Sequence, residues 1–184
     1  MKLFSLSTLV AAVVAAPIDA AEFNFCWLGA AGYSMTGVIG FPDEKLAQDI
    51  ITEEDVTRFE IVGYNRMIPI GTWSMNEASG STTWHLRFDP QTLRFPTGGS
   101  FGTDASQGWN ANGNVTDCGR SGFGFNSGNF SQDFCLFGAW VEQSAIDPTT
   151  PFRATVQPVD AACSGVFLLG ALEDLDTGLV REFS

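Results

Sequence analysis

The segment Glu22-Phe23-Asn24-Phe25-Cys26-Trp27 carries an aromatic side chain at every second position. A period of two is the pattern of a β-strand, so these three aromatic residues are predicted to share one face. The segment from Gly29 to Gly32 supplies a turn, and the segment from Tyr33 to Phe41 is predicted to be the second strand of a hairpin. The fold is therefore expected to start with antiparallel strands.

The rest of the chain repeats this pattern in short segments separated by turn residues. The clearest is Thr82 to Asp89, in which Trp84, Leu86 and Phe88 are predicted to face the core. The other predicted strands are Arg58 to Val62, Met67 to Met75, Thr92 to Phe95, Gly108 to Ala111, Gly122 to Phe125 and Phe134 to Gln143. Many short strands predict an all-β chain folded as an antiparallel β-sandwich of jelly-roll or Ig-like type, with a barrel as the alternative.

Two segments are predicted to depart from the strand pattern. Thr52, with the acid Asp55 three residues later, is typical of a helix N-terminus, so one short helix is predicted near 52–57. The segment from Ala145 to Pro158 holds three prolines and is predicted to be a loop or an extended tail.

The N-terminus has the pattern of a secretory signal. Lys2 precedes an apolar run from Leu3 to Ala16, which is shorter than the roughly 20 apolar residues that a membrane span needs. Cleavage is predicted after Ala20, with a site near Ala15 or an uncleaved anchor as alternatives. The predicted organisation is a signal peptide over 1–20, a β-sandwich domain over 21–157 and a C-terminal tail over 158–184, in a secreted, extracellular or periplasmic protein.

The net charge of −12 limits the classes of partner. Phosphate backbones and anionic membrane surfaces repel a protein of this charge, so we expect no nucleic-acid partner. We also expect no transmembrane anchor, because no apolar run is long enough to span a bilayer.

Four cysteines behind a signal sequence predict two disulfides in an oxidising compartment. Cys118 and Cys135 flank a loop rich in glycine and serine, and closing a loop of this length stabilises by about 3 kcal/mol in the chain-entropy model. The sequence thus favours Cys118–Cys135, which leaves Cys26–Cys163 to join the two ends of the domain.

A sugar-binding patch is predicted around Trp109. Trp27, Trp73, Trp84 and Trp140 fall on predicted strands where burial is expected, whereas Trp109 lies in a region rich in glycine and asparagine, where only short strands linked by tight turns are predicted. We therefore expect Trp109 to be exposed, and His85 and Arg87 to lie beside it as ligand-binding residues. Aromatic faces stack on the apolar faces of sugars.

A calcium site is the alternative use of the same region. Asn110, Asn112, Asn114 and Asp117 place oxygen-bearing side chains at close spacing, and calcium prefers oxygen ligands. The EF-hand pattern is not met, and Asn-Gly equally marks a β-turn. Apart from calcium, no cofactor is expected.

No catalytic motif is found. His85 is the single histidine, so a Ser-His-Asp hydrolase would have to use it, and the sequence has no G-x-S-x-G motif. The 21 acidic residues allow a two-carboxylate glycosidase without pointing to one pair. The chain is therefore predicted not to be an enzyme.

Two segments fit the N-glycosylation pattern, Asn114-Val115-Thr116 and Asn129-Phe130-Ser131. They matter where the chain passes through a secretory pathway that attaches N-linked glycans.

Two stretches, Gly29 to Phe41 and Ile51 to Ile61, resemble small exported bacterial β-proteins of the PEP-CTERM-like type. The segments Val156 to Asp160 and Gly165 to Leu172 are similar to the proline motif and apolar span of their sorting tail. Acidic residues follow that span and only Arg181 stands where the family has an arginine cluster. The resemblance implies an envelope, biofilm or matrix protein.

The sequence thus predicts an exported extracellular or surface-associated protein with a structural or adhesive role. Its expected partner is an extracellular polysaccharide or another component of the envelope. The alternative is a lectin-like carbohydrate-binding module, with or without calcium, and a small hydrolase is the third reading.

Overall fold

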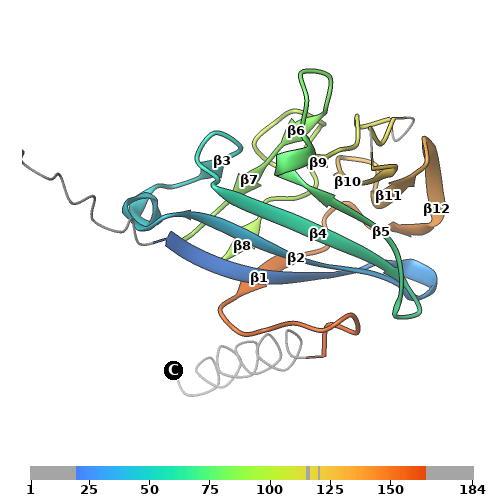
Figure 1. Ribbon diagram of the computed structural model, residues 1–184, viewed down its shortest axis with the longest axis horizontal. Coiled ribbons are helices and arrows are strands. Elements are labelled where there is room, and N and C mark those ends of the chain that lie inside the picture. Colours follow the sequence, from blue (N-terminus) through green and yellow to red (C-terminus); the bar gives the residue numbers. More distant parts are fainter. Residues whose placement is uncertain (1–19, 115–116, 120, 165–184) are drawn as a thin grey trace, which may run out of the picture.

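The computed structural model describes residues 20–114, 117–119 and 121–164 of the chain. Within these ranges the chain forms β-strands and three short 3-10 turns, and two antiparallel sheets pack together (Figure 1). The predicted all-β, antiparallel β-sandwich is confirmed.

The larger sheet has six strands and is built around the predicted N-terminal hairpin. Its strands in spatial order are β5 (Ile68–Ser74), β4 (Arg58–Asn65), β2 (Tyr33–Pro42), β1 (Ala20–Leu28), β13 (Phe152–Thr155) and β8 (Arg94–Phe95). The pairing of β1 with β2 runs from Ala20 opposite Pro42 to Leu28 opposite Ser34, which confirms the hairpin.

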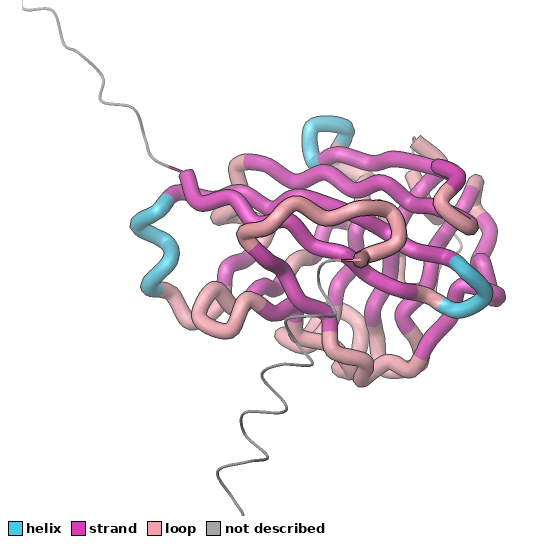
Figure 2. Tube along the Cα trace, turned by 90° about the horizontal axis from the view of Figure 1, so that it is seen from below, coloured by secondary structure: helices cyan, strands magenta, loops and turns pink. Residues whose placement is uncertain are grey.

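The second sheet has five strands, which come mostly from the glycine-rich half of the chain. Its strands in spatial order are β12 (Ala139–Ile146), β11 (Gln132–Leu136), β10 (Phe123–Ser127), β9 (Gln107–Trp109) and β6 (Trp84–His85). A separate two-stranded pair joins β3 (Ile51–Thr52) to β7 (Arg87–Phe88). The 3-10 turns η1 (Ala30–Gly32), η2 (Asp43–Ala47) and η3 (Met75–Glu77) lie at strand ends (Figure 2).

Aromatic side chains fill the space between the two sheets. Alternation along β1 directs Phe23, Phe25 and Trp27 inward, as predicted, and all three are buried. The rings of Phe25 and Phe59 approach to 5.6 Å between centroids, within the range of favourable aromatic pairs. The interior is therefore held by interlocking rings more than by aliphatic side chains.

Both predicted disulfides are confirmed. Cys118 pairs with Cys135 across a sequence separation of 17, and Cys26 pairs with Cys163 across a separation of 137. Two disulfides in a domain of this size fit an oxidising compartment, such as the extracellular space or the periplasm.

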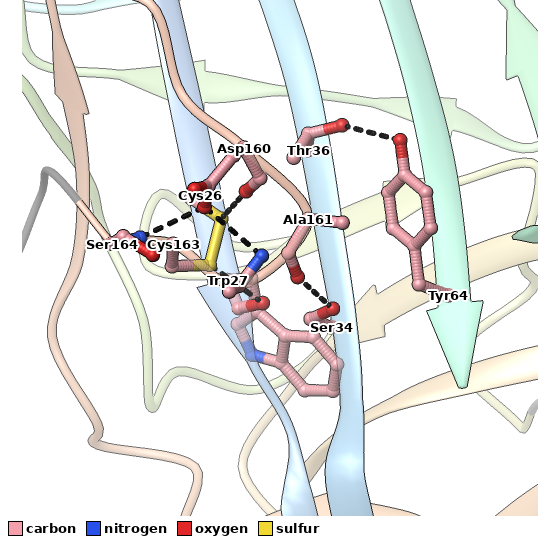
Figure 3. The surroundings of a disulfide bond; sticks show 10 residues. Cys26, Trp27, Ser34, Thr36, Tyr64, Asp160, Ala161, Cys163 and Ser164 are labelled. Carbon is pink, nitrogen blue, oxygen red and sulfur yellow. Dashed lines mark hydrogen bonds between the residues drawn. A yellow bond between two sulfur atoms is a disulfide. The ribbon is translucent and has the colours of Figure 1, made fainter. Parts of the chain in front are cut away.

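The longer disulfide fixes the segment after β13 against the outer face of the larger sheet (Figure 3). Ser34 of β2 donates a hydrogen bond to the carbonyl of Ala161 at 2.6 Å. The Asp160 carboxylate accepts from the backbone N–H groups of Ala162 and Ser164 and so closes a tight turn beside Cys163. The first part of the predicted tail is thus packed on the sandwich.

The predicted signal peptide and tail lie only partly within the described residues. Ala20 is the first residue of β1, and residues 1–19 and 165–184 fall outside the described ranges. No helix among the described residues is long and apolar enough to cross a membrane.

The short helix predicted near 52–57 is wrong. Asp55 accepts hydrogen bonds from the backbone N–H and the hydroxyl of Thr52, which closes a single turn after β3. Thr57 then donates its backbone N–H to the carbonyl of Gly40 at 2.8 Å, so the chain rejoins the sheet before a helix can form.

Two strand predictions in the C-terminal half are also wrong. The expected single strand from Phe134 to Gln143 is a hairpin, because Phe137 (φ 49°) and Gly138 (φ 75°) adopt left-handed conformations and reverse the chain between β11 and β12. The segment predicted as loop or tail contains β13, which pairs with β1 in spite of the prolines at either side.

Candidate functional site

The outer face of the five-stranded sheet carries a polar row that sequence reasoning did not single out. Alternation along β10 and β11 directs Phe125 and Phe134 inward, and these residues pair across the strands. The next pair, Asn126 and Asp133, therefore faces the opposite side. On the neighbouring strand, Trp140 pairs with Cys135 and lies on the same outer face.

A hollow of about 360 Å³ lies on this face, which is within the usual size range of small-ligand sites. It is bounded by the turn between β10 and β11, by part of the 110–114 loop and by Trp140 of β12. Its lining residues are Phe101, Asn112, Gly113, Asn114, Asn126, Gly128, Asn129, Phe130, Ser131, Asp133 and Trp140.

The lining includes two buried acceptor oxygens that lack a well-formed hydrogen bond. Asp133 and Asn126 are 1% and 5% exposed, and within the described residues no donor reaches the Oδ1 atom of either in ordinary hydrogen-bond geometry, although the side chains of Asn126 and Trp140 lie near enough to the Asp133 carboxyl to affect its pKa. The other carboxylate oxygen of Asp133 accepts a hydrogen bond from the Ser131 hydroxyl. An unpaired buried acceptor is unfavourable by about 1–3 kcal/mol, so a donor group that reached these atoms would be favourable.

The electrostatics of the hollow are set by the burial of Asp133. Desolvation raises the pKa of this carboxyl above its ordinary value of 3.8, and the side chains of Ser131, Asn126 and Trp140 offset part of the rise. A raised carboxyl pKa in a concave site is a recognised mark of a functional position.

Aromatic side chains form the rim of the hollow. Trp140 is 49% exposed and Phe130 is 89% exposed, and Phe101 lies at a third edge. Phe101 is seated by close backbone approach, because a Cβ atom at Gly113 (φ 75°) would lie 2.5 Å from its ring. The hollow thus combines acceptor oxygens with exposed aromatic faces.

The prediction that Trp109 is exposed is wrong. Its side chain is 0% exposed and its ring lies 4.7 Å from that of Phe59 and 5.0 Å from that of Phe125. The glycine-rich sequence around it forms β9, whose pairing with β10 places Trp109 opposite Phe125 on the core side. Trp109 therefore offers no surface to a ligand.

His85 and Arg87 take part in a polar network beside the hollow and do not line it. The His85 ring Nε2 lies 2.9 Å from the carbonyl oxygen of Thr103. Arg87 pairs with Glu53 at 2.6 Å and with Asp104 at 3.2 Å, which joins the β3–β7 pair to the loop before β9. These contacts hold the loop that carries Phe101, so their role here is positional.

The four predicted calcium ligands are not brought together. Asn112 and Asn114 line the hollow, whereas the buried side-chain amide of Asn110 donates to the backbone carbonyls of Cys118 and Phe123. The carboxylate of Asp117 accepts from the backbone N–H of Gly119 at 2.8 Å. Within the described ranges, no three His, Cys, Asp or Glu side chains are grouped so as to hold a metal ion.

Apart from Asn112 and Asn114, sequence reasoning did not single out the residues that line the hollow as ligand-binding residues, although one signal was present. Asn126 and Asp133 alternate with the aromatic residues of two short segments on either side of a turn. Pairing these segments as a hairpin would have placed an amide and a carboxyl side by side on the outer face. Trp140 was missed because its strand was predicted in one piece, with its aromatic side chains assigned to the core.

Comparisons with protein-family models, with curated proteins and with solved structures gave no match. The resemblance to PEP-CTERM-like proteins stays a prediction, and the function is argued from the geometry of the hollow.

Proposed function

We propose that the protein is an exported, non-enzymatic carbohydrate-binding protein, and that the hollow on the outer face of the five-stranded sheet takes the sugar. The observation that carries this proposal is the buried carboxyl of Asp133, whose Oδ1 has no well-formed hydrogen bond within the described residues, beside the half-exposed ring of Trp140. Sugar hydroxyls are donors that can satisfy such oxygens, while the apolar face of a sugar ring packs on an aromatic side chain.

Two acceptors in one place favour a ligand with neighbouring hydroxyl groups. Asn126 and Asp133 are direct cross-strand partners, so their side chains stand at the spacing of adjacent residues on one sheet face. A pair of vicinal hydroxyls on a sugar ring presents two donors over a similar distance. The exposed Phe130 and Trp140 supply apolar contact on either side.

The charge of the protein favours uncharged sugars. The chain has a net charge of −12, and the hollow itself contains a carboxyl group. A uronic acid or a sulfated sugar would bring like charge to both, which disfavours binding. The proposed ligand is therefore a neutral glycan.

Binding without hydrolysis is supported by the composition of the hollow. Asp133 is the single carboxylic acid among its described lining residues, whereas most glycosidases use two carboxyl groups on opposite sides of the scissile bond. A polysaccharide partner would also give the adhesive role in an envelope or matrix that the sequence suggests. The signal-like N-terminus and the two disulfides support an extracellular or periplasmic location.

A glycan array tests the proposal with three variants. The full chain is exported to the periplasm of a bacterial host, so that disulfides form without attachment of eukaryotic-type glycans, and is assayed with calcium and with a chelator. Trp140→Ala and Asp133→Asn are each expected to weaken binding at least tenfold. The first removes the aromatic face on which the sugar packs, and the second removes a hydrogen bond to a charged group, which contributes about 1.5–3 kcal/mol. Phe137→Ala is the control, because this exposed aromatic residue lies outside the hollow.

The outcomes separate the site from the function. Binding of neutral glycans that is lost in both hollow variants and kept in Phe137→Ala supports the proposal. Binding that survives both hollow variants refutes the site, and the absence of binding to any glycan refutes the function. Loss of binding on chelation alone would add calcium as part of the site.

A further inference from the structure

The loop that follows β9 contains the single Asn-Gly step of the sequence, Asn112-Gly113. Asn112 is half-buried, Gly113 has a left-handed backbone (φ 75°), and both residues line the hollow. Asparagine is among the thermolabile residues of proteins, and a glycine after it has no Cβ atom to keep its backbone nitrogen away from the asparagine side chain. An attack of that nitrogen on the side-chain amide therefore meets less steric resistance here than at the other asparagines of the chain.

The backbone nitrogen of Gly113 is not held by a β-ladder. Asn112 and Gly113 lie outside the strands, and among the described residues the N–H of Gly113 donates no hydrogen bond. This nitrogen therefore gives up no hydrogen bond when it turns toward the side chain of Asn112. Because the hollow lies on the surface of the sandwich, water reaches the same pair of residues.

A second asparagine of the hollow is protected by the sheet. Asn126 is also followed by a small residue, Ser127, but both lie within β10, which pairs with β9 on one side and with β11 on the other. Asn126 is 5% exposed, and the ladders hold the backbone on either side of it extended. Cyclisation at Asn126 would require the sheet to open, so the structure singles out Asn112.

We propose that Asn112 is a site of spontaneous deamidation, and that this reaction changes the hollow as the protein ages. The backbone nitrogen of Gly113 loses its proton and bonds to Cγ of Asn112, and the side-chain nitrogen takes up a proton and leaves as ammonia. Water then adds to one of the two carbonyl carbons of the resulting cyclic imide and breaks its bond to the ring nitrogen. The products are an aspartate or an isoaspartate at position 112, and no enzyme, oxidant or reductant is required.

Either product alters the lining of the hollow. It adds a carboxylate where Asp133 is the single acid and no cation is present among the described lining residues, and it replaces an amide that can donate hydrogen bonds by a group that only accepts them. Isoaspartate also lengthens the backbone by one carbon atom beside Gly113. A Cβ atom at Gly113 would already lie 2.5 Å from the ring of Phe101, so this ring has to move.

The reaction itself does not depend on what the hollow binds, whereas its consequence for binding rests on the proposed sugar site. If the hollow takes a neutral glycan, the deamidated form is expected to bind it more weakly. The loss should then follow the modified fraction of the protein over time.

Incubation of the purified full chain at mildly alkaline pH, with both disulfides formed, tests the assignment directly. Isoelectric focusing of samples taken over time should show a growing form with one more negative charge. Peptide mass mapping should place the change at Asn112 and leave Asn126 intact, and labelling by protein isoaspartyl methyltransferase should detect the isoaspartate. The rate should rise with pH, because the deprotonated nitrogen is the attacking group.

Two variants at one position separate the reaction from its effect. Asn112→Gln keeps an amide but would have to close a larger ring, so it should abolish the acidic form. Asn112→Asp carries the added charge from the start, and comparison with aged wild-type protein isolates the contribution of the altered backbone.

The outcomes distinguish this proposal from the proposed function. An acidic form that is absent, that arises at another asparagine or that persists in Asn112→Gln overturns the deamidation site. Deamidation at Asn112 that leaves the affinity for the strongest neutral oligosaccharide of the glycan array unchanged overturns its effect on the hollow. Fresh protein that binds no glycan refutes the sugar site, and the mass map still decides the modification.

Discussion

Two tryptophans of the same sheet should respond to truncation in opposite ways. Trp109 is 0% exposed and five phenylalanine rings surround it at 4.7–5.8 Å, whereas Trp140 is 49% exposed on the outer face. Trp109→Ala is expected to lower the free energy of unfolding by about 3–5 kcal/mol, because the rings around the cavity cannot collapse into it. Sugar binding should be unchanged in whatever fraction remains folded.

Trp140→Ala should affect stability much less. About half of the roughly 200 Å² that a tryptophan can bury, at about 25 cal/mol per Å², gives roughly 2.5 kcal/mol as an upper value. The expected loss is therefore about 1–2 kcal/mol. If the proposed site is correct, the same substitution removes most of the affinity for the glycan.

Urea unfolding followed by circular dichroism compares the two variants. With an m-value of about 2 kcal/mol/M, Trp109→Ala should shift the midpoint down by about 2 M and Trp140→Ala by less than about 1 M. Trp109→Phe is the matched control. It keeps most of the packing and removes the indole N–H, which has no partner within the described residues, so its midpoint should lie close to that of the wild type.

Equal midpoint shifts for the two alanine variants would refute the assignment of these side chains to opposite faces. A Trp109→Ala protein that keeps wild-type stability but loses sugar binding would refute the reasoning more directly, because it would show that Trp109 contacts the ligand and is not a core residue.

Three further changes test other parts of the structure. Removing the Cys26–Cys163 bridge, with a sequence separation of 137, should lower the free energy of unfolding by about 5 kcal/mol, against about 3 kcal/mol for the shorter bridge with a separation of 17; urea titration of the two double-serine variants would contradict this reasoning if the losses were equal. Burial raises the pKa of the Asp133 carboxyl above its ordinary value of 3.8. Below pH 3.8 this carboxyl is protonated in both the folded and the unfolded chain and does not affect stability, whereas the free energy of unfolding falls as the pH rises from there through the raised pKa of the folded state. Asp133→Asn should therefore be more stable than wild type at pH 7 and lose this decline, and thermal unfolding across pH 3 to 7 that shows the same decline in both proteins would argue against a buried carboxyl. Gly71→Ala should cost about 1–3 kcal/mol, because its Cβ atom would lie 2.5 Å from that of Phe123, and an unchanged Tm in calorimetry would show that Phe123 can move.

Local patterns in the sequence predicted much of the fold. The aromatic residues of β1 share the core face, β1 and β2 form the expected hairpin, and both disulfides join the predicted cysteines. These features follow from side-chain alternation, from turn residues next to strands and from the small number of ways to pair four cysteines. Each needs only short-range information or simple elimination.

The errors occurred where neighbours distant in sequence decide the outcome. Thr52 and Asp55 can start a helix or close one turn, and the bond from Thr57 to Gly40 of a distant strand selects the turn. The segment containing β13 is weakly strand-like by itself, and pairing with β1 makes it a strand.

The sequence by itself determined the period of two in the strands, the acidic charge and the set of cysteines, because these are properties of residues and their near neighbours. Only the tertiary structure decided which face of the five-stranded sheet each aromatic side chain occupies, since a shift of one residue in register exchanges the core and solvent faces. That register buries Trp109, exposes Trp140 and sets Asp133 beside Asn126 at a hollow formed by loops from separate parts of the chain.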